Sequence, residues 1–518
     1  MYKIIIIGSG LAGIAAAKKL IARGIKPIIL DTGVILEKKN QNAKDYLSKS
    51  KIEEWDERQV QCATQNNDLK KKIPRKYFMG SSFFYGKDKF FDKIKLIETK
   101  SFPAFSYAKS GLSNGWGSAI LPLPREEQCH YPFKLSELDK YYKEAISGIP
   151  YTAEVDGLSD KFNIIRDPDC VFKKDAAIKY FEKNVLLRSK NKFPNLFNYG
   201  SSRLLCDNRT LLGCRICGEC MSGCFNDHIY KPGKDLDELI KQGKINYLKG
   251  CHVHSYSINK NEITVKYRDE NNSFVNTSCS KLILAAGAVN TTRIYARSNN
   301  LHDYKFKLLN KNGIVLPIFG LNYNKDSWPN RSTLPFGFMN FNISPSNLVY
   351  SQLSRLNELI IRRFNNNSRK HNLISKIISG FFVMSHINFD STNSDYYDLF
   401  LTQNKTSEFG DILNIKKNKI NDKTQIKLTL KIIKTVLNSA GYYPISLLKR
   451  STISQHNGGT MPMKKVISNP HETNEYGQTY FHKNVYAVDT SVLPHLSSTP
   501  IGLPLMANAM RICDNIIF

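Results

Sequence analysis

The N-terminal stretch YKIIIIGSGLAGIAAAKKLIARGIKPIILD (residues 2–31) decides the fold of this chain. Its run of four isoleucines is typical of a strand that is buried on both faces. A glycine-rich turn follows at once, and the alanine-rich segment after it predicts a helix that ends at Gly24. The segment from Pro27 predicts a second strand, which ends at Asp31. Strand, turn, helix and strand in this order are typical of a unit that binds a dinucleotide.

The glycines of the turn each meet a mechanical requirement of dinucleotide binding. Gly8 permits the tight turn, Gly10 lets a pyrophosphate approach the backbone, and Gly13 lets helix and strand pack closely. The backbone amides at the start of the helix, at Leu11 and Ala12, are then expected to face the phosphates together with the positive end of the helix dipole.

Asp31 follows the turn by about 20 residues, where an acid can accept both hydroxyls of the adenosine ribose. A secretory signal peptide is the alternative for a lysine followed by an apolar run. We exclude it because no small-residue cleavage site follows and three glycines interrupt the run. FAD and NAD both fit this stretch, and its place at the start of the chain favours FAD.

The composition indicates a globular protein with a strong positive field. The chain has 518 residues, enough for two domains with substantial cores. Its 74 lysines and arginines exceed its 45 aspartates and glutamates, and the net charge of +29 attracts anionic partners. The basic residues are dispersed and no nucleic-acid motif occurs. This leaves an anionic small molecule, a membrane surface, or a solvated surface without a specific partner.

The sequence contains no apolar run that approaches the ~20 residues needed to cross a bilayer. Its eleven cysteines do not follow the spacing of a secreted disulfide framework. With no signal peptide, we expect a cytoplasmic protein, and peripheral contact with a membrane stays open.

Two segments mix small residues with aromatic rings: YFMGSSFFYG (residues 77–86) and SGLSNGWGS (residues 110–118). The second contains Asn114, Gly115 and Gly117. Glycines and serines beside aromatic rings suit a backbone that lies against a flat ring system. The alternative is a pair of tight surface turns. A helix is predicted over residues 135–146, where apolar residues recur at helical spacing.

Four cysteines crowd into the segment LGCRICGECMSGC (residues 212–224): Cys214, Cys217, Cys220 and Cys224. Their spacing equals the run of bacterial ferredoxins, except that Phe225 replaces the usual proline. In ferredoxins the fourth cysteine serves a second cluster, so a single iron–sulfur cluster here needs another ligand, for which Cys206 and Cys251 are candidates. A zinc site, a reduced thiol-rich loop and a disulfide are the alternatives. Zinc is disfavoured because structural zinc sites take two separated pairs of ligands.

The middle of the chain predicts further strands of the nucleotide sheet, and after them the sequence pattern changes. Short strands are expected at residues 245–248, 252–256 and 263–267. Residues 281–288 predict a buried parallel strand that runs into a glycine turn, with a helix beginning near Thr291. Residues 305–450 predict a second domain with an antiparallel sheet. Its expected strands include residues 314–319, 381–389 and 426–430.

The C-terminal part again has the sequence pattern of the nucleotide domain. His456 precedes a Gly-Gly turn, and residues 484–489 predict a strand that ends at Asp489. A loop over 491–504 and a final helix over 505–512 follow. The N-terminus of that helix would point its positive end at the electron-rich edge of a flavin.

Five segments spread over the whole chain resemble motifs of the glucose–methanol–choline (GMC) oxidoreductase family. They are the fingerprint Gly8–Asp31, the segment Ser110–Ser118, the turn Leu284–Thr292, the stretch from His456 to Met463, and Val485 to Ile512. The resemblance implies an α/β fold with a Rossmann-like FAD-binding domain and a discontinuous antiparallel-sheet substrate domain. The FAD-binding domain would comprise residues 1–304 and 451–518, with parts of the substrate cap within 36–200. Residues 305–450, which match no motif, would bind the substrate.

The resemblance also implies roles for individual residues. Gly8, Gly10, Gly13 and Asp31 would hold the ADP moiety, with Leu11 and Ala12 at the phosphates. Val253 would lie at the adenine, Asn114 and Gly115 at the isoalloxazine, and Asp489 near the ribityl chain and the pyrophosphate. Gly117, Gly287 and Pro500 would complete the FAD site. His456 falls on the position of the base that acts at the substrate hydroxyl, and histidine suits this task because its charge changes near neutral pH.

The chain departs from the family pattern at one position. A second histidine or asparagine is expected eleven residues after the acid that matches Asp489, and Pro500 stands there. Proline offers no side-chain hydrogen bond. Either Thr499 or His495 takes the role of the second catalytic partner, or that partner is missing.

These observations predict an FAD-dependent dehydrogenase that oxidises an alcohol, such as a sugar or another polyol, to a carbonyl. The net charge of +29 favours an anionic sugar derivative. With an iron–sulfur cluster, electrons would leave the flavin singly toward a protein or quinone acceptor. The rivals are an oxidase that uses oxygen on the same fold, a flavin-binding protein without catalysis, and an NAD-dependent dehydrogenase, which the C-terminal match disfavours.

Overall fold

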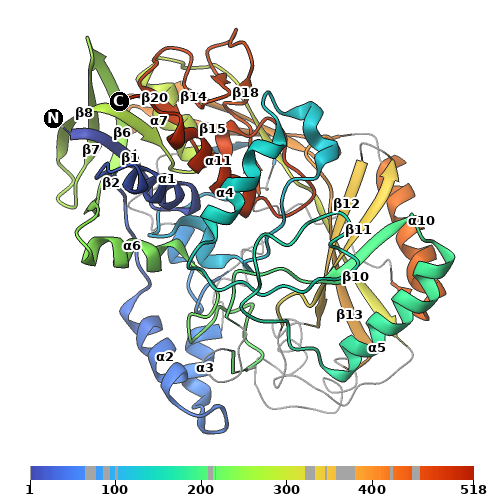
Figure 1. Cartoon of the computed structure of the whole chain (residues 1–518). Helices are drawn as coiled ribbons and strands as arrows, with labels where there is room; N and C mark the ends of the chain where they lie inside the picture. The colour runs from blue at the N-terminus through green and yellow to red at the C-terminus, as the bar shows by residue number, and fades with distance from the viewer. Residues whose placement is uncertain are drawn as a thin grey trace.

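A computed structural model describes residues 2–64, 77–85, 94–99, 103–207, 214–215, 217–320, 333–344, 347–356, 380–407, 409–420, 424–445 and 456–518. A mixed seven-stranded sheet lies beside both chain ends (Figure 1). Its strands, in the order β5-β2-β1-β8-β7-β6 with β20 on β8, are β5 (Asn246–Leu248), β2 (Ile28–Leu30), β1 (Tyr2–Ile7), β8 (Phe274–Leu284), β7 (Glu262–Arg268), β6 (His252–Asn259) and β20 (Val485–Ala487).

The predicted N-terminal unit is present in this sheet. β1 pairs in parallel with β2 and with β8, and β20 adds a further parallel strand to β8. Ile4 to Ile7 are all buried, as expected of a central parallel strand. Four helices lie against this region: α1 (Leu11–Ala22), α4 (Leu138–Ala145), α7 (Ala288–Ser298) and α11 (Gly502–Asp514). The first and last helices join the chain ends, because Arg23 donates to the carbonyl oxygens of Cys513 and Ile516.

A six-stranded antiparallel sheet forms the second layer and has its own apolar core. Its order is β16 (Tyr442–Pro444), β10 (Gly313–Gly320), β13 (Phe382–Asn388), β12 (Asn347–Arg355), β11 (Gly337–Ser344) and β4 (Phe197–Ser201). Figure 1 shows α5 (Ala176–Asn184) and α10 (Thr424–Ser439) over its outer side. A π-helical turn, Val185–Lys190, extends α5.

A five-stranded sheet packs with the N-terminal sheet and consists of β17 (Asn457–Gly458), β9 (Phe306–Asn310), β14 (Tyr396–Gln403), β15 (Asp411–Asn418) and β3 (Ile94–Ile97). Apolar side chains of β9, β14 and β15 share the core of the N-terminal sheet, although these strands lie within the predicted substrate domain, 305–450. The strand β4 joins the second sheet from outside that range. The division into two domains stays a prediction.

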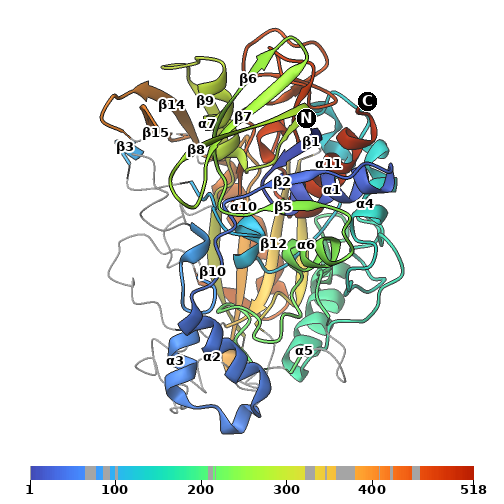
Figure 2. The same ribbon diagram turned by 90° about the vertical axis from the view of Figure 1, so that its left-hand side faces the viewer.

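The remaining elements are short or peripheral. Figure 2 shows α2 (Lys38–Lys49) and α3 (Glu57–Thr64) side by side and away from the N-terminal sheet. The helix α6 (Pro232–Lys241) lies near β5, and β18 (Met463–Lys464) pairs with β19 (Thr473–Asn474). None of the described helices is both long and apolar enough to pass through a membrane.

One element was predicted wrongly. Residues 426–430 were expected to form a strand, but they belong to the 16-residue helix α10. The side chains that α10 buries are Thr429, Ile433, Val436 and Leu437. This is the spacing of one helix face, and it continues beyond the five residues that suggested a strand.

Candidate active site

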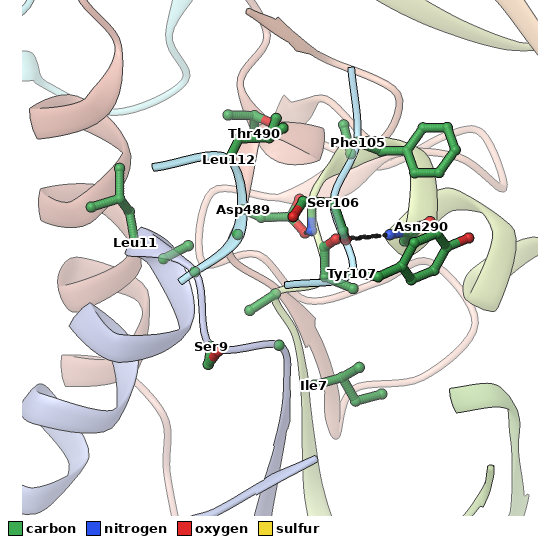
Figure 3. Close-up of a pocket in the computed structure, with 18 of the residues that line it drawn as sticks. Ile7, Ser9, Leu11, Phe105, Ser106, Tyr107, Leu112, Asn290, Asp489 and Thr490 are labelled. Carbon is green, nitrogen blue, oxygen red and sulfur yellow. Dashed lines mark hydrogen bonds between the residues drawn. The ribbon is translucent and has the colours of Figure 1, made fainter. Parts of the chain in front are cut away.

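A cavity with about 1160 Å³ of space free of protein atoms, partly open to solvent, lies at the carboxyl ends of β1 and β8. Figure 3 shows its walls: the glycine turn with Ser9 and Leu11, the segment from Phe105 to Leu112, and the loop with Asp489 and Thr490. Crevices at this end of a parallel sheet are where such folds bind ligands.

The three glycines of the N-terminal turn differ in the space around them. Gly8 has φ +102°, and a Cβ there would lie 2.5 Å from the carbonyl oxygen of Ala285. A Cβ on Gly13 would lie 2.0 Å from the carbonyl oxygen of Gly8. At Gly10, in contrast, a Cβ would meet no heavy atom of the described residues within 4 Å. The first two glycines are therefore required by the turn itself, whereas Gly10 keeps space open at the cavity wall.

The start of α1 presents backbone N–H groups and the positive end of the helix dipole to this cavity. The helix begins at Leu11, directly after Gly10, and its first turn contains no acidic residue and no side-chain cap. The backbone N–H groups of such a first turn have no partner within the helix, and the helix dipole is positive there. This end of the helix suits a phosphate group.

Asp31 is a buried acid on the cavity wall, with an exposed fraction of 7%. Its Oδ2 accepts hydrogen bonds from the hydroxyls of Ser9 and, at 3.1 Å, Tyr247. Burial raises the pKa of this carboxyl to about 6, although the hydroxyls and the neighbouring backbone amides that donate to it act in the opposite direction. Asp31 thus joins the glycine turn to the strand β5.

Asp489 joins the C-terminal loop to the start of α7. Its Oδ2 accepts from the amide of Gly287 at 2.7 Å and from the hydroxyl of Thr291 at 2.5 Å, and its Oδ1 accepts from the amide of Ser491 at 2.9 Å. Burial raises the pKa of Asp489. The carboxyl group therefore fixes one wall of the cavity relative to another.

His456 reaches the same cavity from the far end of the chain. It precedes β17, where Asn457 pairs with Asn310 of β9. A Cβ on Gly458 would lie 2.3 Å from the carbonyl oxygen of Thr490, so the Gly-Gly turn can pack directly against the Asp489 loop. This close packing explains how a histidine so far along the sequence is held beside the N-terminal turn.

Asn457 provides a test of whether a polar ligand fits here. Its Nδ2 donates to the carbonyl oxygen of Ala104 at 2.9 Å. Its Oδ1 is buried and has no hydrogen-bond partner among the residues that the structure describes. Because a buried acceptor without a donor is costly, this orphaned oxygen on the cavity wall favours a ligand that carries hydrogen-bond donors.

Comparisons with known proteins agree with this geometry at the level of the fold. Pyridoxine 4-oxidase from Mesorbium loti superposes with a TM-score of 0.61 at 12% sequence identity, over 99% of this chain and 98% of that one. The chain has the GMC oxidoreductase fold. The resemblance inferred from sequence and the predicted α/β architecture are thereby confirmed as a fold. No protein-family model and no curated protein matches the sequence.

Within this GMC fold, most of the predicted site residues line one cavity. They are Gly8, Gly10, Leu11, Ala12, Asp31, Val253, Gly287, His456 and Asp489. Six others do not contribute to its walls in the described part of the chain: Gly13, Asn114, Gly115, Gly117, Thr499 and Pro500. Asn114 instead closes its own turn, because its Nδ2 donates to the carbonyl oxygens of Lys109 and Gly111, each at 2.8 Å. The roles of all these residues stay predictions.

Sequence reasoning missed a polar face of α7. Asn290, Arg293 and Arg297, at helical spacing, all line the cavity. Arg297 makes a two-point ion pair with Asp411, and burial lowers the pKa of Arg293 well below its ordinary value. The helix itself was predicted from sequence. The helical spacing of its polar residues was therefore the signal that could have revealed this face. These side chains present guanidinium and amide N–H donors at this end of the cavity, groups that suit a ligand with oxygen acceptors.

A buried polar network lies behind the loop that carries Thr499. The Thr499 hydroxyl is 2.8 Å from that of Ser497, which donates to Glu127 Oε1 at 2.6 Å. Lys311 Nζ donates to the carbonyl oxygens of Ser498 at 2.9 Å and Thr499 at 2.6 Å. No local motif marks this network, because its members come from three distant segments.

His495, the other candidate for the second partner, belongs to the same buried region. Its Nδ1 lies 3.1 Å from the Ser391 hydroxyl, and its ring stacks on that of His130 at 4.0 Å. Among the described residues, the cavity wall contains neither His495 nor Thr499. The structure thus brings His456 to the cavity without either predicted companion.

We expect Gly10→Ala to weaken flavin binding at least tenfold while the protein stays folded. The added methyl group has no atom of the described part of the chain within 4 Å but occupies the space that Gly10 leaves at the cavity wall. Flavin content after purification and titration of the apoprotein with FAD measure the effect. The matched control is Gly313→Ala in β10, outside the cavity wall, where the methyl group would lie 3.4 Å from the carbonyl oxygen of Ile387. Equal loss in both variants would contradict the placement of the pyrophosphate at Gly10.

We expect Glu127→Gln to flatten the pH dependence of stability between pH 4.5 and about 7. Burial raises the pKa of Glu127 from its ordinary value of 4.5 to about 8, so the folded protein holds this proton more tightly than the unfolded chain does. The stability it contributes is complete below pH 4.5 and decreases as the pH rises, by at most about 1.4 kcal/mol per unit. Urea unfolding across this range measures the slope.

The neighbouring Glu126 provides the control for this variant. The pKa of Glu126 is lowered, because its bonds to Lys161 and the backbone outweigh its partial burial, so its contribution has the opposite sign. Glu126→Gln should therefore not reduce the slope. The pH range stays below the pH near 7 at which Lys311 loses its proton. An unchanged slope in Glu127→Gln would show that Glu127 is ionised in the folded protein.

Proposed function

We propose that this protein is an FAD-dependent oxidoreductase that oxidises an alcohol group to a carbonyl. One observation carries the proposal: a single cavity is lined both by the N-terminal dinucleotide turn and by His456. Residues separated by more than four hundred positions thus line one cavity, which supports this proposal. The GMC oxidoreductase fold supports the same reaction class.

Successive parts of the cavity wall suit successive chemical groups of FAD. The start of α1 would bind the pyrophosphate, while Asp31 and Val253 would bind the adenosine end. Ile501 and Leu505, at the start of the last helix, provide apolar surface for the ring system at the other end. Bound FAD would supply an acceptor for a hydride at N5.

His456 would act on the substrate hydroxyl. A hydride can leave the carbinol carbon only as the hydroxyl proton departs, and an imidazole nitrogen at the cavity wall can accept that proton. Asn457, next to it, presents the orphaned Oδ1 that can accept a hydrogen bond from a donor on the ligand. The side chains of the chain thus orient the substrate and remove one proton.

A sugar or other polyol is the substrate class that we propose, with preference for an anionic derivative. The net charge of +29 concentrates anions around the protein. We further propose that a protein or a quinone, rather than oxygen, takes the electrons, and that the cysteine-rich segment holds an iron–sulfur cluster. The fold match is to a protein named as an oxidase, which favours the rival in which oxygen is the acceptor.

An absorption spectrum and anaerobic reduction test the proposal. We expect protein purified without oxygen to be yellow, and its flavin to bleach with a member of a panel of neutral polyols and sugar acids. Reoxidation by a dye or a quinone, without hydrogen peroxide, would separate a dehydrogenase from an oxidase. A colourless protein would contradict the FAD proposal and favour an NAD-dependent enzyme.

A flavin-binding protein without catalysis is the second candidate. It is favoured by the absence of Thr499 and Pro500 from the cavity walls in the described part of the chain. In that case no alcohol would bleach the bound flavin, and replacement of His456 would change nothing.

A further inference from the structure

A second cavity, with about 450 Å³ of space free of protein atoms, is lined by five cysteines. Four belong to the ferredoxin-like segment 214–224, and the fifth is Cys206. Trp55, Phe225, Ile229 and Leu334 contribute apolar walls. No disulfide involves any cysteine in the part of the chain that the structure describes. The chain therefore gathers five cysteine side chains around one space.

The loop that carries four of these cysteines is fixed to its surroundings. Arg215 donates to the carbonyl oxygens of Ser48 at 2.8 Å and Ser50 at 2.7 Å, at the end of α2. Gly223 has φ +111°, and a Cβ there would lie 2.5 Å from the ring of Phe78. The sharp turn between the last two cysteines thus requires glycine, and the loop is held on both sides.

Cys206 supplies the ligand that the ferredoxin-like spacing lacks. Its backbone pairs with Ile229, and its carbonyl oxygen accepts from the Thr152 hydroxyl at 2.7 Å. Its thiol lies close enough for electrostatic interaction with three thiols of the segment: Cys214, Cys220 and Cys224. Cys251, the other sequence candidate, does not line this cavity and packs in the core of the N-terminal sheet.

The thiols surround a volume rather than a point. No group of three or more His, Cys, Asp or Glu side chains in the described residues is arranged to hold a single metal ion. A zinc ion needs its thiolates at about 2.3 Å from one centre. A cluster of several irons and sulfides is larger and is held by four thiolates around it.

One hydrophobic cluster of side chains connects the two cavities. Ala104, Ala108 and Leu112 line the nucleotide cavity, Cys217 and Phe225 line the cysteine cavity, and all five pack in this cluster. The packed side chains between the two sites are therefore continuous. An iron–sulfur cluster bound at the cysteines would be separated from a bound flavin by packed side chains and not by solvent.

We propose that Cys214, Cys217 and Cys220, with Cys206 as the fourth ligand, hold a four-iron iron–sulfur cluster that carries electrons away from the flavin. Binding of the cluster is independent of the proposed function, whereas its redox role rests on it. Oxidation of one alcohol to a carbonyl releases two electrons and two protons. A cluster held by these cysteines would accept the electrons one at a time and would pass each to an external one-electron carrier, a protein or a quinone, while the protons go to solvent.

Chemical analysis of anaerobically purified holoprotein tests the proposal. We expect about four irons and four acid-labile sulfides per chain, no zinc, and an electron paramagnetic resonance signal after reduction with dithionite. Cys206→Ser and Cys220→Ser should lose most of the iron and keep the flavin, which reports that they are folded. Cys206→Ala provides a second variant. Cys251→Ser, a buried thiol outside the cavity, should keep both iron and flavin.

Each other result overturns a defined part of the inference. Protein with flavin but without iron, also after incubation with ferrous iron and sulfide, would exclude the cluster and leave alcohol oxidation untouched. Stoichiometric zinc without iron would do the same. Loss of iron in Cys224→Ser but not in Cys206→Ser would contradict the ligand set. A full cluster in a protein whose flavin no alcohol bleaches would instead contradict the proposed function.

Discussion

His456→Ala is expected to lower the rate of flavin reduction by an alcohol by a factor of about 10² to 10⁴, the range that a positioned general base contributes. The imidazole lines the cavity that also contains the dinucleotide turn, so its removal leaves the substrate hydroxyl without an acceptor for its proton. Flavin content should not change, because the walls at the glycine turn and Asp489 are intact. Stopped-flow bleaching of the flavin under anaerobic conditions measures the rate.

Two further measurements make this prediction specific to the imidazole. Added imidazole should restore part of the lost rate in His456→Ala, since it can enter the space that the side chain leaves. His302→Ala is the matched control, because His302 does not line the cavity, and it should behave like the unaltered protein. Unchanged bleaching in His456→Ala would show that another group removes the proton.

The N-terminal unit could be predicted because its signals are local and agree with one another. The strand, the turn glycines, the helix and Asp31 lie within 31 residues, and each requires the residue type that stands there. His456 could be placed through the motif around it. The structure adds the reason: Gly458 allows the turn to pack against Thr490.

The parts that sequence reasoning missed depend on contacts between distant segments. The polar face of α7 lines the cavity together with the glycine turn and the Asp489 loop, which lie far from α7 in the sequence. The buried network joins Glu127, Lys311 and Ser497, which no local pattern connects. Residues 426–430 show the converse error, since a strand was predicted over five residues of a much longer helical pattern.

Lys311→Met is expected to lower the free energy of unfolding by about 2–4 kcal/mol at pH 8, since each buried acceptor left without a donor costs about 1–3 kcal/mol. The Lys311 amine donates to two carbonyl oxygens, those of Ser498 and Thr499, and both residues are fully buried. Methionine has a similar length but cannot donate. Removal of a buried amine offsets part of the loss, because burial lowers the pKa of Lys311 to about 7 and disfavours its charged form.

Urea unfolding of the holoprotein measures this effect, and Lys307→Met is the matched control on the exposed side of β9. We expect the control to stay within about 0.5 kcal/mol of the unaltered protein, as is usual for surface substitutions. The sign of the pH dependence gives a second check. Because the folded-state pKa of Lys311 is depressed, its contribution to stability increases as the pH rises from about 7 toward 10.5. Lys311→Met should lose this increase, and a variant that loses stability equally at every pH would show that the amine stays protonated beside Glu127.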